Sequence, residues 1–414
     1  MKFGRFAMAT AVAALMALPA AATDVEFMSW TYAEDANKPL IESMIESFDG
    51  GEVEAQGYAW GEMNKNYLLR DRTNTLPDVG QSQARLLPII ANIDDLQDFN
   101  EIIGRDKLLE TFDEGYLAMG EIDGKQLALP WIVGTIGMVA NTEVLDAAGV
   151  EGIPATMDEF KAALVAVRDN VPNSVPLGLA TKNPNSILLD YITWVWTFGG
   201  EPLTADGKPA VNSPEAVAAL EFMTDAVSER LAAPEIDRPD ARRLFAQGAT
   251  AFYIDAPQAL SFARDFSGRG EEIDAAVKPI KAPVLKEGDT PVSIQWGHVL
   301  TVFGDENASA DSPAVEFVMH LLSDQELVPY AVGLSTLPAT KSGIASEEVQ
   351  SDQYLADWAA ASVSPKRNTI ASLPQGAEVT TVIGEEVQAS LLGQKSPQEA
   401  ADDMQARLED ILGN

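Results

Sequence analysis

Apolar and polar residues near the N-terminus follow one another in a pattern that predicts a strand, a helix and a second strand. Residues 25–30 alternate as a strand does, residues 40–48 carry apolar side chains at helical spacing, and residues 53–58 alternate again. A turn at 76–79 then leads into a further short strand. This order is typical of proteins in which helices cover a sheet, so we expect the α/β class.

Four helix starts can be recognised from their capping residues. Each has a Ser or Thr that is followed by a proline, by a Glu three residues later, or by both. These starts are Thr156 with Glu159, Ser213 with Pro214, Ser312 with Pro313, and Ser396 with Pro397 and Glu399. Between the helices, apolar segments predict strands at 136–140, 251–254 and 299–303.

Composition limits the classes of function. The chain has 414 residues, which favours two domains, or three, and its 46% hydrophobic content is ample for a core. Its net charge of −35 argues against binding to nucleic acid and to anionic lipid. The absence of Cys excludes disulfides, thiolate metal sites, a Cys nucleophile and a lipid-modified Cys.

Residues 1–22 have the three parts of a secretory signal peptide. Lys2 and Arg5 form a charged start, residues 6–18 are apolar, and three alanines supply the small residues of a cleavage site. The apolar run is too short to span a bilayer, which needs ~20 residues. We therefore expect an exported protein that begins at Thr23 and does not insert into the membrane.

The sequence shows no recognisable catalytic or cofactor motif. Only His298 and His320 could serve as an imidazole base, and neither lies near a nucleophile elbow. Motifs for zinc, calcium, nucleotide phosphates and dinucleotides do not occur. We expect no metal and no cofactor. A glycosidase needs only two suitably spaced carboxylates, so an enzyme of that class remains an alternative.

Four tryptophans stand out, and most lie near predicted strand ends: Trp30, Trp131, Trp194 and Trp296. A flat aromatic face suits the apolar face of a sugar ring, and neighbouring polar groups could bind the hydroxyls. The alternative for each is that the ring is simply part of the core.

Several segments resemble extracellular solute-binding proteins of the sugar-binding type, the substrate receptors of bacterial ABC importers. The similarity is clearest in residues 123–131, 137–149 and 156–160, although Ala140 and Met157 replace the usual Tyr and Trp. Further similar segments follow in the family's order: 198–200, 212–216, 245–252, 296–297, 312–328, 337–338 and 396–412.

The resemblance implies two α/β lobes around a ligand cleft, joined by three hinge crossings. The crossings would lie near 131–134, near 279–283 and after Pro338. One lobe would then contain residues 23–132 and 283–338, and the other residues 134–280 and 340–414.

The resemblance also implies ligand-binding positions. The strand after Val79 normally ends in the cleft, which makes Gln81, Gln83 and Arg85 candidates. An Arg fork can bind vicinal hydroxyls, a carboxylate or a phosphate. Asp255 occupies a cleft position in relatives, but it could instead be a turn residue before a proline. His298, two residues after Trp296, completes the candidate set.

We therefore expect a monomeric, non-enzymatic periplasmic substrate-binding protein of an ABC importer. It would capture a sugar or sugar derivative by lobe closure and deliver it to the inner-membrane permease. One alternative is a secreted two-domain carbohydrate-active enzyme. Another is the same receptor class with a sugar phosphate, polyol or amine ligand. An Arg/Lys cluster in the cleft would favour a phosphate, and an aromatic box with several acids would favour an amine.

Overall fold

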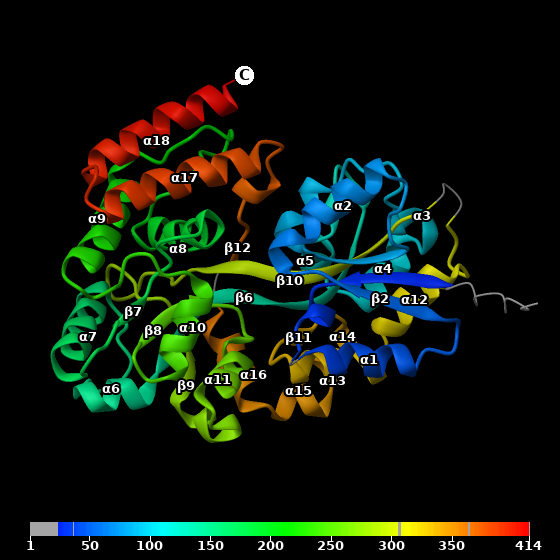
Figure 1. The fold of residues 1–414 in the computed structure, drawn as a ribbon, viewed down its shortest axis with the longest axis horizontal. Helices are drawn as coiled ribbons and strands as arrows, with labels where there is room; N and C mark the ends of the chain where they lie inside the picture. The colour runs from blue at the N-terminus through cyan, green and yellow to red at the C-terminus, as the bar shows by residue number, and fades with distance from the viewer. Residues whose placement is uncertain (1–23, 36, 305–307, 363–364, 414) are drawn as a thin grey trace, which may run out of the picture.

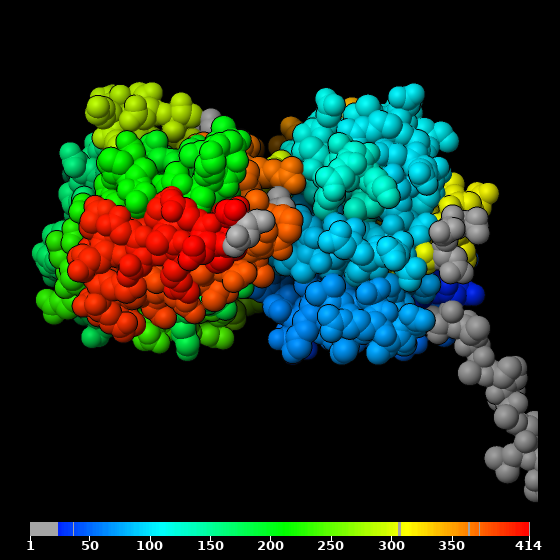
Figure 2. Space-filling view, turned by 90° about the horizontal axis from the view of Figure 1, so that it is seen from above, coloured from blue at the N-terminus to red at the C-terminus, as the bar shows by residue number. Residues whose placement is uncertain are grey.

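The structure, a computed structural model, shows two lobes side by side (Figure 1). It describes residues 24–35, 37–304, 308–362 and 365–413. The predicted signal peptide lies outside these residues. Seen from above, the surface is hollowed between the two lobes (Figure 2). Within the described ranges, no helix is long and apolar enough to cross a membrane.

A ten-stranded mixed sheet runs through both lobes. Along its main path the strands are β2 (Val53–Gly57), β1 (Val25–Ser29), β3 (Val79–Gln83), β10 (Ser293–Val302), β6 (Leu129–Asn141), β8 (Phe252–Asp255) and β7 (Leu177–Gly178). Three short strands pair beside this path: β9 (Val277–Ile280) and β11 (Leu337–Pro338) with β6, and β12 (Pro365–Lys366) with β10. A separate hairpin joins β4 (Glu121–Ile122) to β5 (Lys125–Gln126).

Strands β6 and β10 belong to both lobes. They pair antiparallel with each other from Leu129 to Ile136 of β6. Beyond this point, residues 137–141 of β6 pair with β8 and β9. In the other direction, residues 298–302 of β10 pair with β3. The two strands therefore form a common spine, visible across the middle of Figure 1.

The first lobe surrounds β1, β2, β3 and β11. Its helices are α1 (Lys38–Glu46), α2 (Met63–Arg72), α3 (Phe99–Ile102), α4 (Arg105–Thr111), α5 (Glu114–Leu117), α12 (Pro313–Leu321), α13 (Asp324–Gly333), α14 (Lys341–Ile344) and α15 (Glu347–Ser351). Three short 3₁₀ turns, η1 (Thr31–Ala33), η2 (Trp60–Glu62) and η3 (Ala84–Ile89), carry residues from the ends of its strands toward the second lobe.

The second lobe surrounds β7, β8 and β9. Its helices are α6 (Thr142–Ala148), α7 (Met157–Asn170), α8 (Pro184–Thr197), α9 (Pro214–Ser228), α10 (Arg238–Ala246), α11 (Ala259–Ser267), α16 (Gln353–Ala361), α17 (Gly376–Leu391) and α18 (Pro397–Leu412). The 3₁₀ turns η4 (Gly270–Ala276) and η5 (Ile370–Ser372) complete it.

The predicted helix starts are confirmed, with one difference in detail. Thr156 and Ser396 each form a full capping box, and the Ser213 side chain accepts a hydrogen bond from the Ala216 N–H. Ser312 precedes α12 as predicted, but its hydroxyl donates to the Ser309 carbonyl at 2.9 Å and does not cap the helix. The predicted strands are all present, although 136–140 is only part of the 13-residue β6.

Two of the predicted ligand-binding tryptophans lie in the cores. Trp131 stacks on Tyr330 in the first lobe, with ring centroids 4.2 Å apart. Trp194 in the second lobe contacts Phe222 at 4.6 Å and Phe160 at 5.8 Å. Both indoles are 0% exposed. This packing contradicts the expectation that their faces meet a ligand, because core side chains already cover them.

Two segments pack against the lobe opposite to the one predicted. Val284 pairs with Ala155 and Met157 of the second lobe, although it was expected in the first. The Lys341 ammonium donates to the Leu109 carbonyl of the first lobe at 2.8 Å, although it was expected in the second. The bounds of the two lobes and the positions of the three crossings stay a prediction. That these crossings act as a hinge stays a prediction.

The burial of Trp194 predicts a stability defect on truncation. Trp194→Ala should lower the free energy of unfolding by ~3–5 kcal/mol, because it leaves a large cavity among packed rings. Urea unfolding of the purified protein measures this loss. Phe266→Ala, at a ring that is 36% exposed, is the control and should cost far less. A Trp194→Ala protein as stable as the wild type would contradict the core assignment.

Candidate functional site

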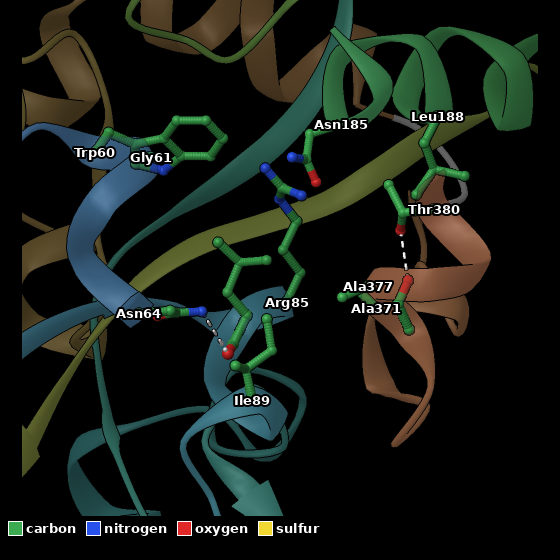
Figure 3. Close-up of a pocket in the computed structure, with 12 residues that line it drawn as sticks. Trp60, Gly61, Asn64, Arg85, Ile89, Asn185, Leu188, Ala371, Ala377 and Thr380 are labelled. Atoms are coloured by element: carbon green, nitrogen blue, oxygen red, sulfur yellow. Dashed lines mark hydrogen bonds between the residues drawn. The ribbon is translucent and has the colours of Figure 1, made fainter. Parts of the chain in front are cut away.

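A pocket opens between the lobes, with about 730 Å³ of space including its part open to solvent. The first lobe contributes residues from η2, α2 and η3, and the second lobe contributes residues from α8, η5 and α17. The lining residues are Trp60, Gly61, Asn64, Arg85, Leu86, Ile89, Asn185, Leu188, Ala371, Gly376, Ala377 and Thr380 (Figure 3). None of these described lining residues carries a carboxylate or an imidazole.

Arg85 is the cation of this pocket. Figure 3 shows its side chain reaching into the space between Trp60 and Asn185, which belong to opposite lobes. Its Nε donates to the Gln83 side-chain oxygen at 3.0 Å, and its guanidinium carbon lies 5.5 Å from the centroid of the Trp60 ring. The predicted pair Gln83 and Arg85 is therefore brought together at the cleft, where Gln83 orients the guanidinium.

The electrostatic environment of Arg85 is unfavourable to its charge. Burial lowers the pKa of Arg85 to about 10, and repulsion from Arg238 in the second lobe adds to the effect. Arg238 itself is only 8% exposed and forms a buried ion pair with Asp190. Its second terminal nitrogen, Nη1, has no hydrogen-bond partner. Two guanidinium groups therefore influence each other from opposite lobes.

Asp255, which was predicted to bind the ligand in the cleft, forms an ion pair with Arg242. Its two carboxylate oxygens accept from Arg242 at 2.7 and 2.8 Å, and one also accepts from the Ala256 N–H. Burial acts to raise the pKa of Asp255, but Arg242 outweighs it and the pKa is lowered. Arg242 in turn lies over the Phe262 ring, 3.8 Å from its centroid. Asp255 therefore anchors Arg242.

Three of the predicted residues form one buried aromatic cluster in the first lobe. The His298 ring lies between Trp30 and Trp296, with both centroid distances at 4.6 Å. Gln81 holds this imidazole through a 3.1 Å contact from its Nε2 to Nδ1. The Gln81 oxygen accepts from Ser29 at 2.6 Å, which leaves the amide nitrogen as the donor to His298. All four predicted residues are less than 6% exposed.

Trp296 also lines a second, smaller cavity that shares Arg85 with the first. Arg85 is common to both cavities, and the second one is lined by Ala84, Arg85, Met119, Gln295, Trp296, Arg367 and Asn368. Asn368 is 4% exposed, and its Nδ2 has no partner. Arg367 is exposed and makes no ion pair among the described residues.

Sequence reasoning missed Trp60, Arg238 and Arg242. Trp60 follows a predicted strand, as Trp30 does, so the same rule could have found it. Arg238 and Arg242 are four residues apart at the start of α10 and therefore lie on one face of that helix. Their carboxylate partners come from α8 and β8, and nothing in the linear sequence shows those pairings. The described residues contain no cluster of His, Asp or Glu that could hold a metal ion.

The burial of His298 predicts a pH-dependent stability. Burial lowers the pKa of His298 from 6.5 to about 3, so between these pH values the unfolded chain binds a proton that the folded chain does not. Stability then falls as the pH falls, by ~1.4 kcal/mol per pH unit. Between pH 7 and pH 5 the wild type should lose about 2 kcal/mol more than His298→Gln in urea unfolding. An equal loss in both proteins would show that His298 is not held neutral.

Sequence relatives cover most of the chain. A binding protein of Brucella abortus (strain 2308) is 24% identical over 313 residues, which are 74% of this chain and 73% of that protein. A protein of Deinococcus radiodurans described as an ABC transporter-binding protein is 26% identical over 52% of each chain.

Solved structures share the fold. The GacH receptor of Streptomyces glaucescens, studied unliganded and with acarbose, matches with a TM-score of 0.82 and 20% identity, over 94% of this chain and 98% of that one. Maltose-bound MalE3 of T. maritima matches with a TM-score of 0.81 and 21% identity, over 94% and 99%. The family profile for bacterial extracellular solute-binding proteins matches residues 31–357. The chain therefore belongs to the bacterial extracellular solute-binding proteins.

Proposed function

We propose that this protein is the periplasmic receptor of an ABC importer and that it captures a saccharide between its two lobes. The observation that carries the proposal is the pocket itself, which both lobes line and which combines an aromatic ring with polar side chains. That pattern suits a ligand with apolar faces and polar edges, as a sugar ring has. The fold neighbours include receptors solved with acarbose and with maltose.

Each lobe supplies a different part of the binding surface. From the first lobe, Trp60 offers an indole face and Arg85 offers a planar set of donors. From the second, Asn185 and Thr380 offer groups that can bind hydroxyls. A ligand that contacts both sets is bound best when the lobes are close together, so its binding energy favours the closed form. Recognition of that form by a membrane permease would couple capture to import.

The arrangement supports binding over hydrolysis. A glycosidase needs two carboxyl groups that flank the scissile bond. The pocket-lining residues offer none, and the nearby buried acids Asp190 and Asp255 are neutralised by Arg238 and Arg242. We therefore propose a non-enzymatic receptor. The aromatic platform is Trp60, with Trp296 at the second cavity; Trp296 is one of the four tryptophans expected from the sequence, and Trp60 is not.

Ligand screening tests the proposal directly. A panel of neutral and acidic oligosaccharides is added to the purified protein, and the melting temperature is measured. A ligand present at 100 times its Kd stabilises the native state by about 2.7 kcal/mol, which gives a clear shift. If no saccharide raises the melting temperature or binds in calorimetry, the proposed function is wrong.

Trp60→Ala tests the aromatic platform. Loss of a stacking ring should cost about 2 kcal/mol of binding free energy, or roughly thirtyfold in Kd for the saccharide found in the screen. The apo melting temperature should change little, because Trp60 is only half-buried. Phe266→Ala, on α11 and outside the pocket lining, controls for loss of an aromatic surface residue. If Trp60→Ala binds the saccharide as tightly as the wild type, Trp60 is not part of the binding site.

A further inference from the structure

Most arginines of the described residues form ion pairs with acids, and two of those that do not lie at the cleft. Among the described residues, nine of thirteen arginines form an ion pair with Asp or Glu. The four that do not are Arg72, Arg85, Arg230 and Arg367. The chain has 63 Asp and Glu residues for 28 Lys and Arg, so unpaired arginines are not due to a shortage of acids. Yet Arg85 and Arg367 line the same cavity with no carboxylate partner.

A further donor in the wall of this cavity also has no partner. Asn368 lines the same cavity and is only 4% exposed. Its Nδ2 has no hydrogen-bond partner. Arg238, whose charge acts on Arg85 across the cleft, leaves Nη1 unpaired at 8% exposure. Buried donors normally have partners. Arg238 lines neither cavity, but Asn368 does, and its unpaired donor beside Arg85 and Arg367 indicates an acceptor that arrives with the ligand.

Two helices add positive potential from the second lobe. The first turn of α17 lines the pocket with Gly376 and Ala377, and its N-cap Gln375 makes no side-chain capping bond. The first turn of α8 lines it with Asn185. The N-terminal end of a helix carries a partial positive charge and exposes backbone N–H groups. These ends face a pocket whose described lining residues already include Arg85 and no acid.

From these observations we propose that the saccharide is acidic, with the carboxylate of a uronic acid residue held between Arg85 and Arg367 and reached by Asn368. The inference rests on the function proposed above. The planar guanidinium fork matches a carboxylate in two parallel hydrogen bonds. The bound carboxylate would also relieve the repulsion between Arg85 and Arg238. The sugar ring would lie against Trp60 or Trp296, the aromatic residues that line the two cavities that share Arg85.

The test compares acidic oligosaccharides with their own neutral esters. Di- and trisaccharides of galacturonate, glucuronate and mannuronate are titrated into the wild-type protein by calorimetry, each beside its methyl ester and a neutral parent oligosaccharide. We expect one acid series to bind at least tenfold more tightly than its ester. The preference should shrink when salt is raised, because exposed charges are screened.

Arg85→Gln and Arg367→Gln identify the groups that hold the carboxylate. Each should weaken binding of the acid at least tenfold and weaken binding of the ester much less, so that the preference for the acid over its ester is lost. Arg85→Gln should fold at least as well as the wild type, since it removes a repelled, partly buried charge, and Arg367 is exposed. Arg72→Gln is the matched control, since Arg72 is also unpaired but lies at the exposed end of α2. It should leave both affinities unchanged.

The outcomes separate this inference from the function on which it rests. If neutral oligosaccharides bind as tightly as the acids, or if a sulfated disaccharide binds and the uronates do not, the carboxylate assignment is wrong and the receptor remains. If no saccharide of any charge binds, both proposals fail. If the acids bind but Arg85→Gln and Arg367→Gln bind them as the wild type does, the site is elsewhere in the cleft.

Discussion

The hydrogen-bonded pair of β6 and β10 is the constraint on which the rest of the structure depends. The ladder runs from Leu129 to Ile136 of β6 with one shift of register between His298 and Val299 of β10, and each strand then continues into a different lobe, β6 into the second and β10 into the first. Because both lobes are built on the same two strands, the hydrogen bonds between β6 and β10 fix how the lobes are placed along the spine. Residues of opposite lobes, such as Arg85 and Arg238, are consequently held near enough for their charges to interact.

Charge within that gap is distributed unequally between the lobes. The second lobe holds Arg238 and Arg242 against its own acids, so their positions are set without a ligand. Arg85 in the first lobe has only Gln83 and the Trp60 ring. Burying the Arg85 charge without a counter-charge costs free energy, so it disfavours a closed form that holds no ligand. A ligand that supplies the missing acceptor would favour closure for the same reason.

Local signals in the sequence predicted much of the fold. Capping residues gave correct helix starts, because the hydrogen bonds that they make lie within four residues of chain. The site was harder to predict, because its contacts are non-local. Trp131 and Trp194 look like Trp30 and Trp296 in the sequence, yet Tyr330 and Phe222 cover the first two in the cores. Likewise, only the fold shows that Asp255 binds Arg242.

Closure of the two lobes on a saccharide is the central claim, and an interlobe distance tests it most directly. The chain has no cysteine, so Leu69→Cys on α2 and Leu392→Cys at the end of α17 can be labelled selectively with spin labels. These positions are 56% and 39% exposed and lie in different lobes. Pulsed electron resonance should show the distance between the labels becoming shorter and its distribution narrower when the saccharide found by screening is added. An unchanged distribution at saturating ligand would contradict closure.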